Sequence, residues 1–360
     1  MKQYVVLSHT PWAHGLGRIQ QLTARLGKGE VLFFQPAASL VDGSWKKDGK
    51  QVRPHVTLYT LPPVWSFAGR AGEIPRPALR RQIRFVEERM TRHGFRSATL
   101  WLTSPEQFFF IDRLPVRGLI YDCDRFWPHE LDDRESRLAL AADVIFAASP
   151  LLRERLSPCN SNVALVPNGV NYPMFSRSHF GVPPLFHGIS GPILGWCGSL
   201  GDGLDLMPVE AAAKQHPEWT VVLLGRREGC DDLSRLKRLP NVRIPGACPM
   251  MELPEYLGRF HVLLNLRRPQ ETESDVIPCR MYEYLATGKP IVSRLLPDEV
   301  EDFPDVVYGA HSTEEFVRLC ERALTEDSEW VAERRRNYGE GASWSRRGEE
   351  VRKILDAIVL

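Results

Sequence analysis

Short, continuously apolar runs alternate with longer runs of helical periodicity along the first half of the sequence, and this pattern constrains the fold most. The apolar runs are YVVLSH, EVLFFQP, ATLWLTS, GLIYDCD, DVIFAAS and VALVPNG, and helix-like segments such as GRIQQLTARLGKG lie between them. Strands that are apolar on both faces are typical of a parallel sheet covered by helices on both sides. Residues 1–168 are therefore predicted to form one doubly wound α/β domain.

The segment that follows interrupts this rhythm with proline, glycine and serine, and residues 169–190 are predicted to be an interdomain linker. The apolar runs ILGWCGS, TVVLLG, NVRIPG, HVLLNL and PIVSRL then indicate a second doubly wound domain over residues 191–335. Residues 336–360 carry apolar side chains at helical spacing and are predicted to close the chain as a helix. The expected fold class is α/β, with two Rossmann-like domains that face a cleft. Ligands bind at the carboxyl ends of the strands in such sheets.

Composition and charge exclude several classes of protein. The 360 residues carry a formal net charge of +1, which gives no reason to expect a nucleic-acid partner. The seven cysteines occur singly, so neither a disulfide framework nor a structural zinc site is expected, and a reducing compartment fits best. The apolar run at the amino terminus is too short for a signal peptide, and no run reaches the roughly 20 apolar residues of a membrane-spanning helix. We expect a cytoplasmic protein, at most peripheral on the inner face of the cytoplasmic membrane.

The stretch ESDVIPCRMYEYLATGKPIVS, residues 273–293, holds the strongest candidate site. Pro278 suits the first position of a helix, because proline has no N–H to lose there. The helix is predicted to run to about Ala286 and to end at Gly288. The backbone N–H groups of residues 276–279 then lie at the positive end of the helix dipole, which favours a phosphate or electron-rich sugar oxygens.

Two carboxylates flank this predicted helix start. Asp275 lies in the preceding loop, and Glu283 lies about a turn and a half into the helix. A carboxylate accepts two hydrogen bonds side by side, which matches adjacent hydroxyls of a ribose or of another sugar. The two acids can therefore hold two diols with a diphosphate between them. The alternative is that Asp275 only caps the helix and Glu283 only faces solvent, although the apolar residues around Glu283 argue against a freely exposed position.

The loop SHTPWAHGLGRIQQL, after the first predicted strand, is a second candidate site. Gly15 and Gly17 let the backbone approach a bound diphosphate at the start of the next helix, and Arg18 can face the cleft. A simple strand-to-helix turn with a surface arginine is the alternative. His9 and His14 either contact a donor sugar or have no chemical role.

Asp122 and Asp124 fall at the end of the run GLIYDCD. Acids at the carboxyl end of a strand can orient an acceptor hydroxyl, or act as the base of an inverting enzyme, so both are candidate catalytic residues. The alternative is a structural aspartate that bonds neighbouring backbone.

Residues 76–96, RPALRRQIRFVEERMTRHGFR, hold seven arginines against two glutamates and predict a basic amphipathic helix. Arg80, Arg81 and Arg84 are candidates for binding anionic lipid headgroups or a lipid diphosphate acceptor. A plain solvated helix is the alternative.

Several motifs resemble nucleotide-sugar glycosyltransferases of the GT-B fold, above all the retaining family 4 and its bacterial polysaccharide branch of the teichuronic acid type. PCRMYEYLATGKPIVS is similar to that branch's Pro-x-Lys-x-x-Glu-Tyr-Leu-Ala-x-Gly-Lys-Pro-Val-Val segment. VPNGVNYPMF resembles its Pro-Asn-Gly-Val-Asp-x-x-x-Phe signature, and ILGWCGSLGDGLDL resembles the first strand and loop of its nucleotide domain. These and further segments span most of the chain in the family's order.

The resemblance implies transfer of a sugar from a nucleoside diphosphate sugar to a hydroxyl acceptor, with retention at the anomeric carbon and with neither a metal nor a cofactor. It also implies a hexosyl donor, a lipid-linked or oligosaccharide acceptor, and a role in bacterial surface polysaccharide or glycolipid synthesis. The alternatives are inversion at the anomeric carbon, a nucleotide-sugar 2-epimerase, and a non-catalytic scaffold that keeps the fold.

The resemblance also assigns site residues. The family's Glu-(seven residues)-Glu motif corresponds to Asp275 and Glu283, with Asp275 as a catalytic candidate. The basic pair that many family members carry after the first nucleotide-domain strand is absent, since Ser199 and Asp205 lie in that region, so other arginines must meet the phosphate charge. The expected donor-binding residues are Gly15, Gly17, Arg18, Gly198, Arg226, Val276, Ile277, Arg280 and Glu283.

Overall fold

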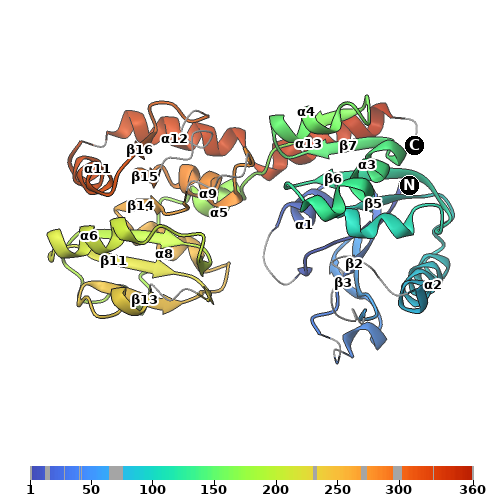
Figure 1. The fold of residues 1–360 in the computed structure, drawn as a ribbon, viewed down its shortest axis with the longest axis horizontal. Coiled ribbons are helices and arrows are strands. Elements are labelled where there is room, and N and C mark those ends of the chain that lie inside the picture. The colour runs from blue at the N-terminus through green and yellow to red at the C-terminus, as the bar shows by residue number, and fades with distance from the viewer. Residues whose placement is uncertain are drawn as a thin grey trace. The chain divides into compact units, whose positions relative to one another are not determined.

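The computed structural model describes residues 2–12, 17–27, 29–39, 41, 43–64, 76–229, 233–268, 274–294, 302–326 and 328–358. The chain divides into two compact units (Figure 1). Unit 1 comprises Met1–Asn168 and Ser345–Leu360, and unit 2 comprises Gly169–Trp344. Each unit has its own sheet and its own buried apolar residues.

Unit 1 is built on an eight-stranded sheet with the order β3-β4-β2-β1-β5-β6-β7-β8. Neighbouring strands are parallel, except that β3 pairs antiparallel with β4 at one edge. Every residue of β5 and β7 is buried, as expected for central parallel strands. The strands are β1 Gln3–Leu7, β2 Glu30–Gln35, β3 Lys50–Arg53, β4 Val56–Thr60, β5 Ala98–Leu102, β6 Val116–Cys123, β7 Val144–Ala147 and β8 Val163–Leu165.

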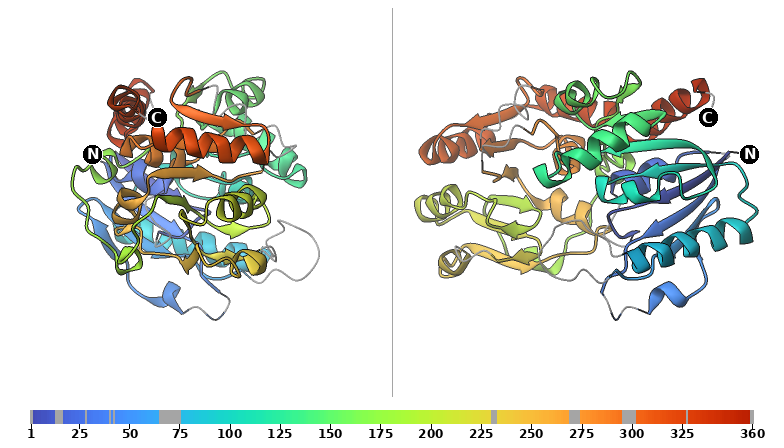
Figure 2. Two further views of the ribbon diagram at one scale, coloured as in Figure 1. Left: turned by 90° about the vertical axis from the view of Figure 1, so that its left-hand side faces the viewer. Right: turned by 45° about the vertical axis from the view of Figure 1, so that its right-hand side comes forward.

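Amphipathic helices cover the unit 1 sheet. The longest of them, α2, buries Leu79, Phe85 and Met90, and Phe85 meets Phe34 of β2 edge to face with ring centroids 6.3 Å apart. Figure 2 shows α2 running alongside the first strands of the sheet. The helices are α1 Arg18–Thr23, α2 Arg76–Arg92, α3 Asp132–Ala141 and α4 Pro150–Leu156, with short 3-10 turns at Ser44–Lys46, Pro105–Phe110 and His129–Leu131.

The last helix, α13 (Trp344–Ala357), returns the chain to unit 1. The ammonium group of Lys2 donates to the backbone oxygen of Leu355 at 2.7 Å and pairs with Asp356 at 2.8 Å. A Cβ on Gly348 would lie only 2.7 Å from the Cβ of Arg25, so the helix packs closely against the end of α1. Residues near the end of the chain therefore complete the unit that its first residues begin.

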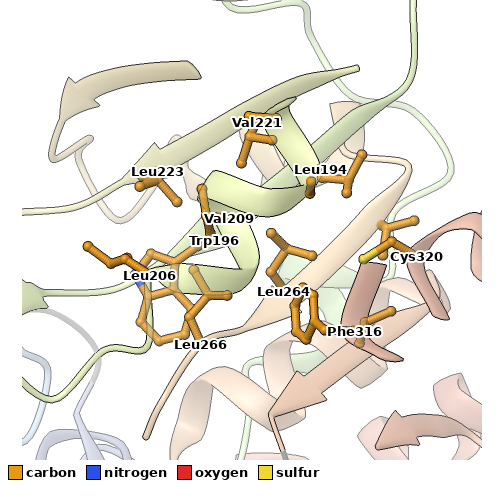
Figure 3. Packing of buried hydrophobic residues seen from close by; sticks show 14 of the residues in the cluster. Leu194, Trp196, Leu206, Val209, Val221, Leu223, Leu264, Leu266, Phe316 and Cys320 are labelled. Atoms are coloured by element: carbon orange, nitrogen blue, oxygen red, sulfur yellow. The ribbon is translucent and has the colours of Figure 1, made fainter. Parts of the chain in front are cut away.

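Unit 2 is built on a six-stranded, wholly parallel sheet with the order β13-β11-β9-β14-β15-β16. One face of this sheet packs against α6 and α11, in a core that includes Trp196, Leu264 and Phe316 (Figure 3). The strands are β9 Ile193–Cys197, β10 Leu200–Gly201, β11 Thr220–Leu224, β12 Arg227–Glu228, β13 Val242–Gly246, β14 Val262–Asn265, β15 Ile291–Arg294 and β16 Val307–Ala310. The helices are α5 Tyr172–Phe175, α6 Met207–Gln215, α7 Leu233–Leu236, α8 Leu253–Arg259, α9 Cys279–Thr287, α11 Thr313–Thr325 and α12 Glu329–Gly341, with a 3-10 turn at Pro184–Phe186.

The predicted fold class, α/β with two parallel Rossmann-like sheets, is confirmed. Each of the apolar runs singled out in the sequence overlaps a strand. In the part of the chain that the structure describes, no helix is both long enough and apolar enough to cross a bilayer.

Candidate functional site

The main candidate site lies at the amino end of helix α9. The helix runs from Cys279 to Thr287, so it begins one residue later than predicted, and Pro278 occupies the N-cap position with extended backbone. Pro278 supplies no side-chain cap, and the first turn carries no acidic residue. The helix itself therefore does not neutralise the positive end of its dipole. Gly288 ends the helix in the left-handed conformation (φ 75°), as predicted from its position.

Helix α9 is fixed to the unit 2 sheet through its buried face. The hydroxyl of Tyr284 accepts a hydrogen bond from the backbone N–H of Cys197, the last residue of β9, at 2.9 Å. The pairing of β9 with β14 ends at Gly195, so the phenol supplies a partner that the neighbouring strand does not. At the other end of the helix, the fully buried Arg335 donates to the backbone oxygen of Gly288 at 3.1 Å. The amino end of α9 is thereby held at the carboxyl ends of the parallel strands.

Arg280, in the first turn of α9, stacks on the indole of Trp196, with its Cζ 3.9 Å from the ring centroid. Trp196 is buried in β9, and its Nε1 donates to the backbone oxygen of Gly198 at 3.3 Å. A Cβ on Gly198 would lie 2.4 Å from Nη1 of Arg280, so glycine is what allows the guanidinium to lie so close to the loop. The structure thus brings together two of the predicted donor-binding residues, Gly198 and Arg280.

Glu283 lies on the buried face of α9 and is 8% exposed. Burial raises the pKa of its carboxyl from 4.5 to about 7, and the positive charge of Arg280 offsets only part of that rise. Among the described residues, none donates a hydrogen bond to this carboxylate. Such a group gains from a ligand whose hydroxyls can donate to it, because a buried ion without donors is unfavourable.

The loop before α9 holds the other predicted residues of this motif. Asp275 and Val276 are half-buried, whereas Ile277 is 7% exposed and packs with Met281 and Leu285 of the helix. The buried isoleucine anchors the loop directly before the N-cap. Asp275 stands two residues ahead of that anchor.

Two further charged positions lie at the carboxyl edge of the unit 2 sheet. Arg226 is exposed two residues after β11, and its backbone oxygen accepts a hydrogen bond from the Leu200 N–H at 2.7 Å. Asp205 pairs with Arg294, the last residue of β15, at 2.9 Å. The region after β9, where the resemblance leads one to expect a basic pair, therefore carries an acid that pairs with an arginine from β15.

In unit 1 the structure pairs two predicted site residues with each other. Nε and Nη2 of Arg18 each lie 2.8 Å from Oδ1 of Asp122, and the two side chains are 4% and 2% exposed. Nη1 of Arg18 also donates to the backbone oxygen of Val166, just after β8. This sealed ion pair ties α1 to the ends of β6 and β8. The geometry favours a structural role for both residues over the donor-binding and catalytic roles expected of them.

Asp124, two residues further on, is 18% exposed and is clamped by Arg125, which donates to it at 2.8 and 3.2 Å. Burial acts to raise the pKa of this carboxyl, but the hydrogen bonds from Arg125 and the charges of His9 and Arg18 hold that pKa below its ordinary value. His9, from the loop after β1, places its Nε2 at 3.8 Å from Oδ2 of Asp124. Asp124 therefore faces a second predicted residue at the carboxyl edge of the unit 1 sheet.

The remaining predicted residues lie apart from these groups or outside the described residues. Gly17 is the N-cap of α1, while Gly15 and His14 lie outside the described residues. The three candidate arginines of α2 are exposed, and the guanidinium of one of them stacks over the ring of Trp45, with its Cζ 5.6 Å from the centroid. These three arginines are Arg80, Arg81 and Arg84, of which Arg81 makes the stacking contact.

Sequence reasoning missed three aromatic residues that shape the candidate sites. Trp196 and Tyr284 lie in apolar runs, where an aromatic residue is indistinguishable from ordinary core. Trp127 follows Asp124 by three residues, and its indole meets the ring of His9 edge to face with centroids 5.4 Å apart. Only its position close after a strand end could have drawn attention to it.

Two Rossmann-like units, each with polar residues at the carboxyl ends of parallel strands, are the architecture of the GT-B class. Residues 208–353 match the family model described as glycosyl transferase-like. The predicted resemblance is confirmed: the chain is similar to glycosyltransferases of the GT-B fold and of the family 4 type.

Among curated proteins, the chain is 28% identical over 273 residues to TuaH of Bacillus subtilis (strain 168), which is named as a teichuronic acid biosynthesis glycosyltransferase. The alignment covers 68% of each chain. Among solved structures, sucrose-phosphate synthase from Thermosynechococcus elongatus matches with a TM-score of 0.74 at 14% identity, over 99% of this chain and 98% of that chain. HepE of Anabaena, in complex with UDP and glucose, matches with a TM-score of 0.68 at 14% identity, over 99% and 100%. At these identities, the two structural matches concern the fold.

Proposed function

We propose that this chain transfers a sugar from a nucleoside diphosphate sugar to a hydroxyl acceptor. The observation that carries the proposal is the arrangement at the carboxyl edge of the unit 2 sheet, where Arg280 lies against Gly198 and Glu283 is buried beside them on the same helix. A departing diphosphate needs positive charge, and an arginine at the amino end of a helix supplies it.

In this proposal, Arg280 and the first turn of α9 stabilise the diphosphate, together with the backbone of Val276 and Ile277. Glu283 accepts hydrogen bonds from adjacent hydroxyls of the donor. Bound hydroxyls favour the ionised carboxylate, so donor binding lowers the pKa of Glu283 from about 7 and releases a proton near neutral pH. Asp275, in the loop, holds the second diol, on the sugar that is transferred.

Uridine diphosphate hexoses are the first donors to test, because Anabaena HepE shares the fold and is in complex with UDP and glucose. The name of TuaH supports a role in bacterial surface polysaccharide or glycolipid synthesis. The likeness to family 4 supports retention at the anomeric carbon. A lipid-linked or oligosaccharide acceptor fits this role, and the exposed arginines of α2 then hold unit 1 against the anionic inner face of the membrane.

Calorimetry with UDP, followed by activity assays with a panel of UDP- and GDP-hexoses, tests the donor site. Glu283→Gln is expected to lower the affinity for UDP at least tenfold, because one of the two acceptor oxygens is replaced by an NH2 donor and the negative charge is lost. Glu333→Gln, at an exposed position on α12, is the matched control and is expected to bind UDP as the wild type does. An unchanged affinity in Glu283→Gln contradicts the assignment of this residue.

The reaction itself is tested by following the diphosphate. Release of UDP that depends on an added acceptor supports transfer. Isomerisation of the donor sugar without UDP release indicates an epimerase, and failure to bind any nucleotide sugar indicates a non-catalytic scaffold. Either of these two results overturns the proposal.

A further inference from the structure

We infer that the cavity between the 3-10 turn Pro105–Phe110 and helix α3, in unit 1, binds an amphiphilic anion from solution, that is, an apolar body joined to a carboxylate or phosphate group. The residues that line this cavity belong neither to the candidate donor site nor to the group formed by His9 and Asp124. The inference concerns binding alone, so it does not depend on the proposed function.

The cavity has the size and the lining of a small-molecule site. Its volume is about 610 Å³, within the range of about 300–1,000 Å³ that is typical of such sites. One wall is formed by the end of the 3-10 turn and the residues that follow it, and the other by the second half of α3. Leu140 on α3 is 67% exposed, so apolar surface is open to water here. The apolar lining consists of Phe108, Phe109, Ile111, Leu140 and Ala141.

The wall formed by the 3-10 turn is held in place without a ligand. Oε1 of Gln107 accepts a hydrogen bond from the backbone N–H of Ser104 at 3.2 Å, and Oγ of Ser104 accepts one from the backbone N–H of Glu106 at 3.2 Å. This capping box fixes the start of the turn. Just beyond its end, Asp112 adopts left-handed backbone (φ 58°), which aspartate tolerates better than most residues do. A ligand therefore meets a preformed wall, and its binding orders few side chains.

Positive charge exceeds negative charge around the cavity. Cζ of Arg137 lies 4.3 Å from the ring centroid of Phe108, and this stacking leaves the N–H groups at the edge of the guanidinium available. The contact of Arg137 with Asp133, at 3.8 Å, joins two exposed side chains and contributes little. Arg113 also lines the cavity and has no ion pair among the described residues. The described lining thus holds two cations against one acid, Asp112.

An amphiphilic anion satisfies both parts of this lining. Its apolar body covers the phenylalanine rings and Leu140, and its carboxylate accepts two parallel N–H bonds from Arg137. An uncharged polyol leaves the apolar walls unmatched, and a cation meets like charge. A bilayer presents a flat surface, whereas this cavity has walls on two sides, so the geometry favours a single dissolved molecule over a membrane.

Dodecanoate, kept below its micelle concentration, is the probe, and calorimetry with the full chain measures its affinity. Leu140→Asp is expected to lower that affinity at least tenfold, and Arg137→Gln at least threefold, because each removes one part of the match. Both side chains are exposed, so neither variant threatens the fold. Leu151→Asp and Arg153→Gln, at exposed positions on α4, are the matched controls and are expected to bind dodecanoate as the wild type does.

Asp112→Asn gives a readout that damage to the fold cannot imitate. It removes the only acid among the described residues that line the cavity, and asparagine also tolerates the left-handed backbone. The affinity for dodecanoate is therefore expected to rise at least twofold. Dodecyltrimethylammonium carries the same chain with the opposite charge, and it is expected to bind the wild type at least tenfold more weakly than dodecanoate does. Amide hydrogen exchange in residues 105–113 and 132–141 is expected to slow when dodecanoate binds.

Three outcomes overturn the inference. The first is no binding of dodecanoate, or an affinity that is the same in the wild type, Leu140→Asp and Asp112→Asn. The second is equal binding of dodecanoate and dodecyltrimethylammonium, which would mean apolar contact without recognition of charge. The third is binding only when dodecanoate is embedded in phosphatidylcholine vesicles, which would make the cavity a membrane contact. Failure of the wild type to bind UDP overturns the proposed function and leaves this inference standing.

Discussion

The hydroxyl of Tyr284 accepts a hydrogen bond from the backbone N–H of Cys197, and this single contact joins the helix of the candidate donor site to the central strand beside it. Both residues are buried, so water cannot replace the lost partner in a variant. Tyr284→Phe is expected to destabilise the protein by about 1–3 kcal/mol, since it leaves a buried N–H unsatisfied. Urea unfolding measures this loss. Tyr308→Phe, a half-buried tyrosine whose hydroxyl has no hydrogen bond within the described residues, is the control and should change stability little.

Because of Glu283, the folded protein is expected to lose stability as the pH rises toward neutral. Its folded pKa of about 7 lies above its ordinary value of 4.5, so the folded state binds the proton more tightly than the unfolded state. The stability that this provides is complete below pH 4.5 and is lost as the pH rises through 7. The amide of Glu283→Gln has no such loss, so without ligand the variant should gain up to about 3 kcal/mol on the wild type between pH 4.5 and pH 8. Calorimetric melting of both proteins at the two pH values measures this gain. A stability difference between variant and wild type that is the same at pH 4.5 and pH 8 would contradict the raised pKa.

Gly198 controls the position of Arg280. A methyl group at residue 198 would lie 2.4 Å from Nη1 of Arg280, so Gly198→Ala must displace the guanidinium from the face of Trp196. UDP affinity is expected to fall at least fivefold, because the arginine leaves the place proposed for the diphosphate. Gly341→Ala is the control, since no atom lies within 4 Å of a Cβ there. Equal UDP affinities of the two variants, measured by calorimetry, would argue against a role for this loop.

The ion pair of Arg18 and Asp122 is expected to behave as a structural element. Asp122→Asn leaves the buried guanidinium without its counter-charge and should cost about 3–5 kcal/mol in urea unfolding. The double variant Arg18→Met, Asp122→Leu removes both charges and should recover most of that loss, with UDP affinity as in the wild type. Loss of UDP binding in a double variant of normal stability would instead place the pair in the donor site.

The arginines of α2 offer a test of the proposed membrane contact. Arg80, Arg81 and Arg84 are exposed on one helix, and each basic group near an anionic surface contributes about 1 kcal/mol to binding. Replacing all three with glutamate is expected to reduce co-sedimentation with phosphatidylserine vesicles about a hundredfold or more. A charge-matched control reverses three exposed basic residues of unit 2, namely Arg227, Lys237 and Arg238. Equal losses in the two triple variants would mean that only net charge matters.

The sequence predicts the central strands of both sheets because each is a compact apolar run between breakers. It does not predict the antiparallel edge strand β3, whose four residues are all exposed or half-buried, nor its neighbour β4. It also does not predict β16, an edge strand of the unit 2 sheet, because a glycine interrupts its apolar run. Edge strands are held by one neighbour only, so their sequences need less apolar surface than central strands do.

In the candidate donor site, the features that depend on a residue's own backbone could be predicted from the sequence. The features that depend on contacts between distant residues could not. Proline and glycine mark the two ends of α9 because both act through their own backbone. The stacking of Arg280 on Trp196 depends on a helix meeting a strand more than eighty positions away, which no local pattern encodes. The pairing of Arg18 with Asp122, across 104 positions, was missed for the same reason, and each residue alone looked like a ligand.

The return of α13 to unit 1 has a consequence for how the chain is made. The first 168 residues leave the ribosome long before residues 345–358, which carry the contacts to Lys2 and Arg25. During translation, the first 168 residues of unit 1 therefore lack helix α13, and the surface that this helix covers stays exposed until unit 2 has been synthesised.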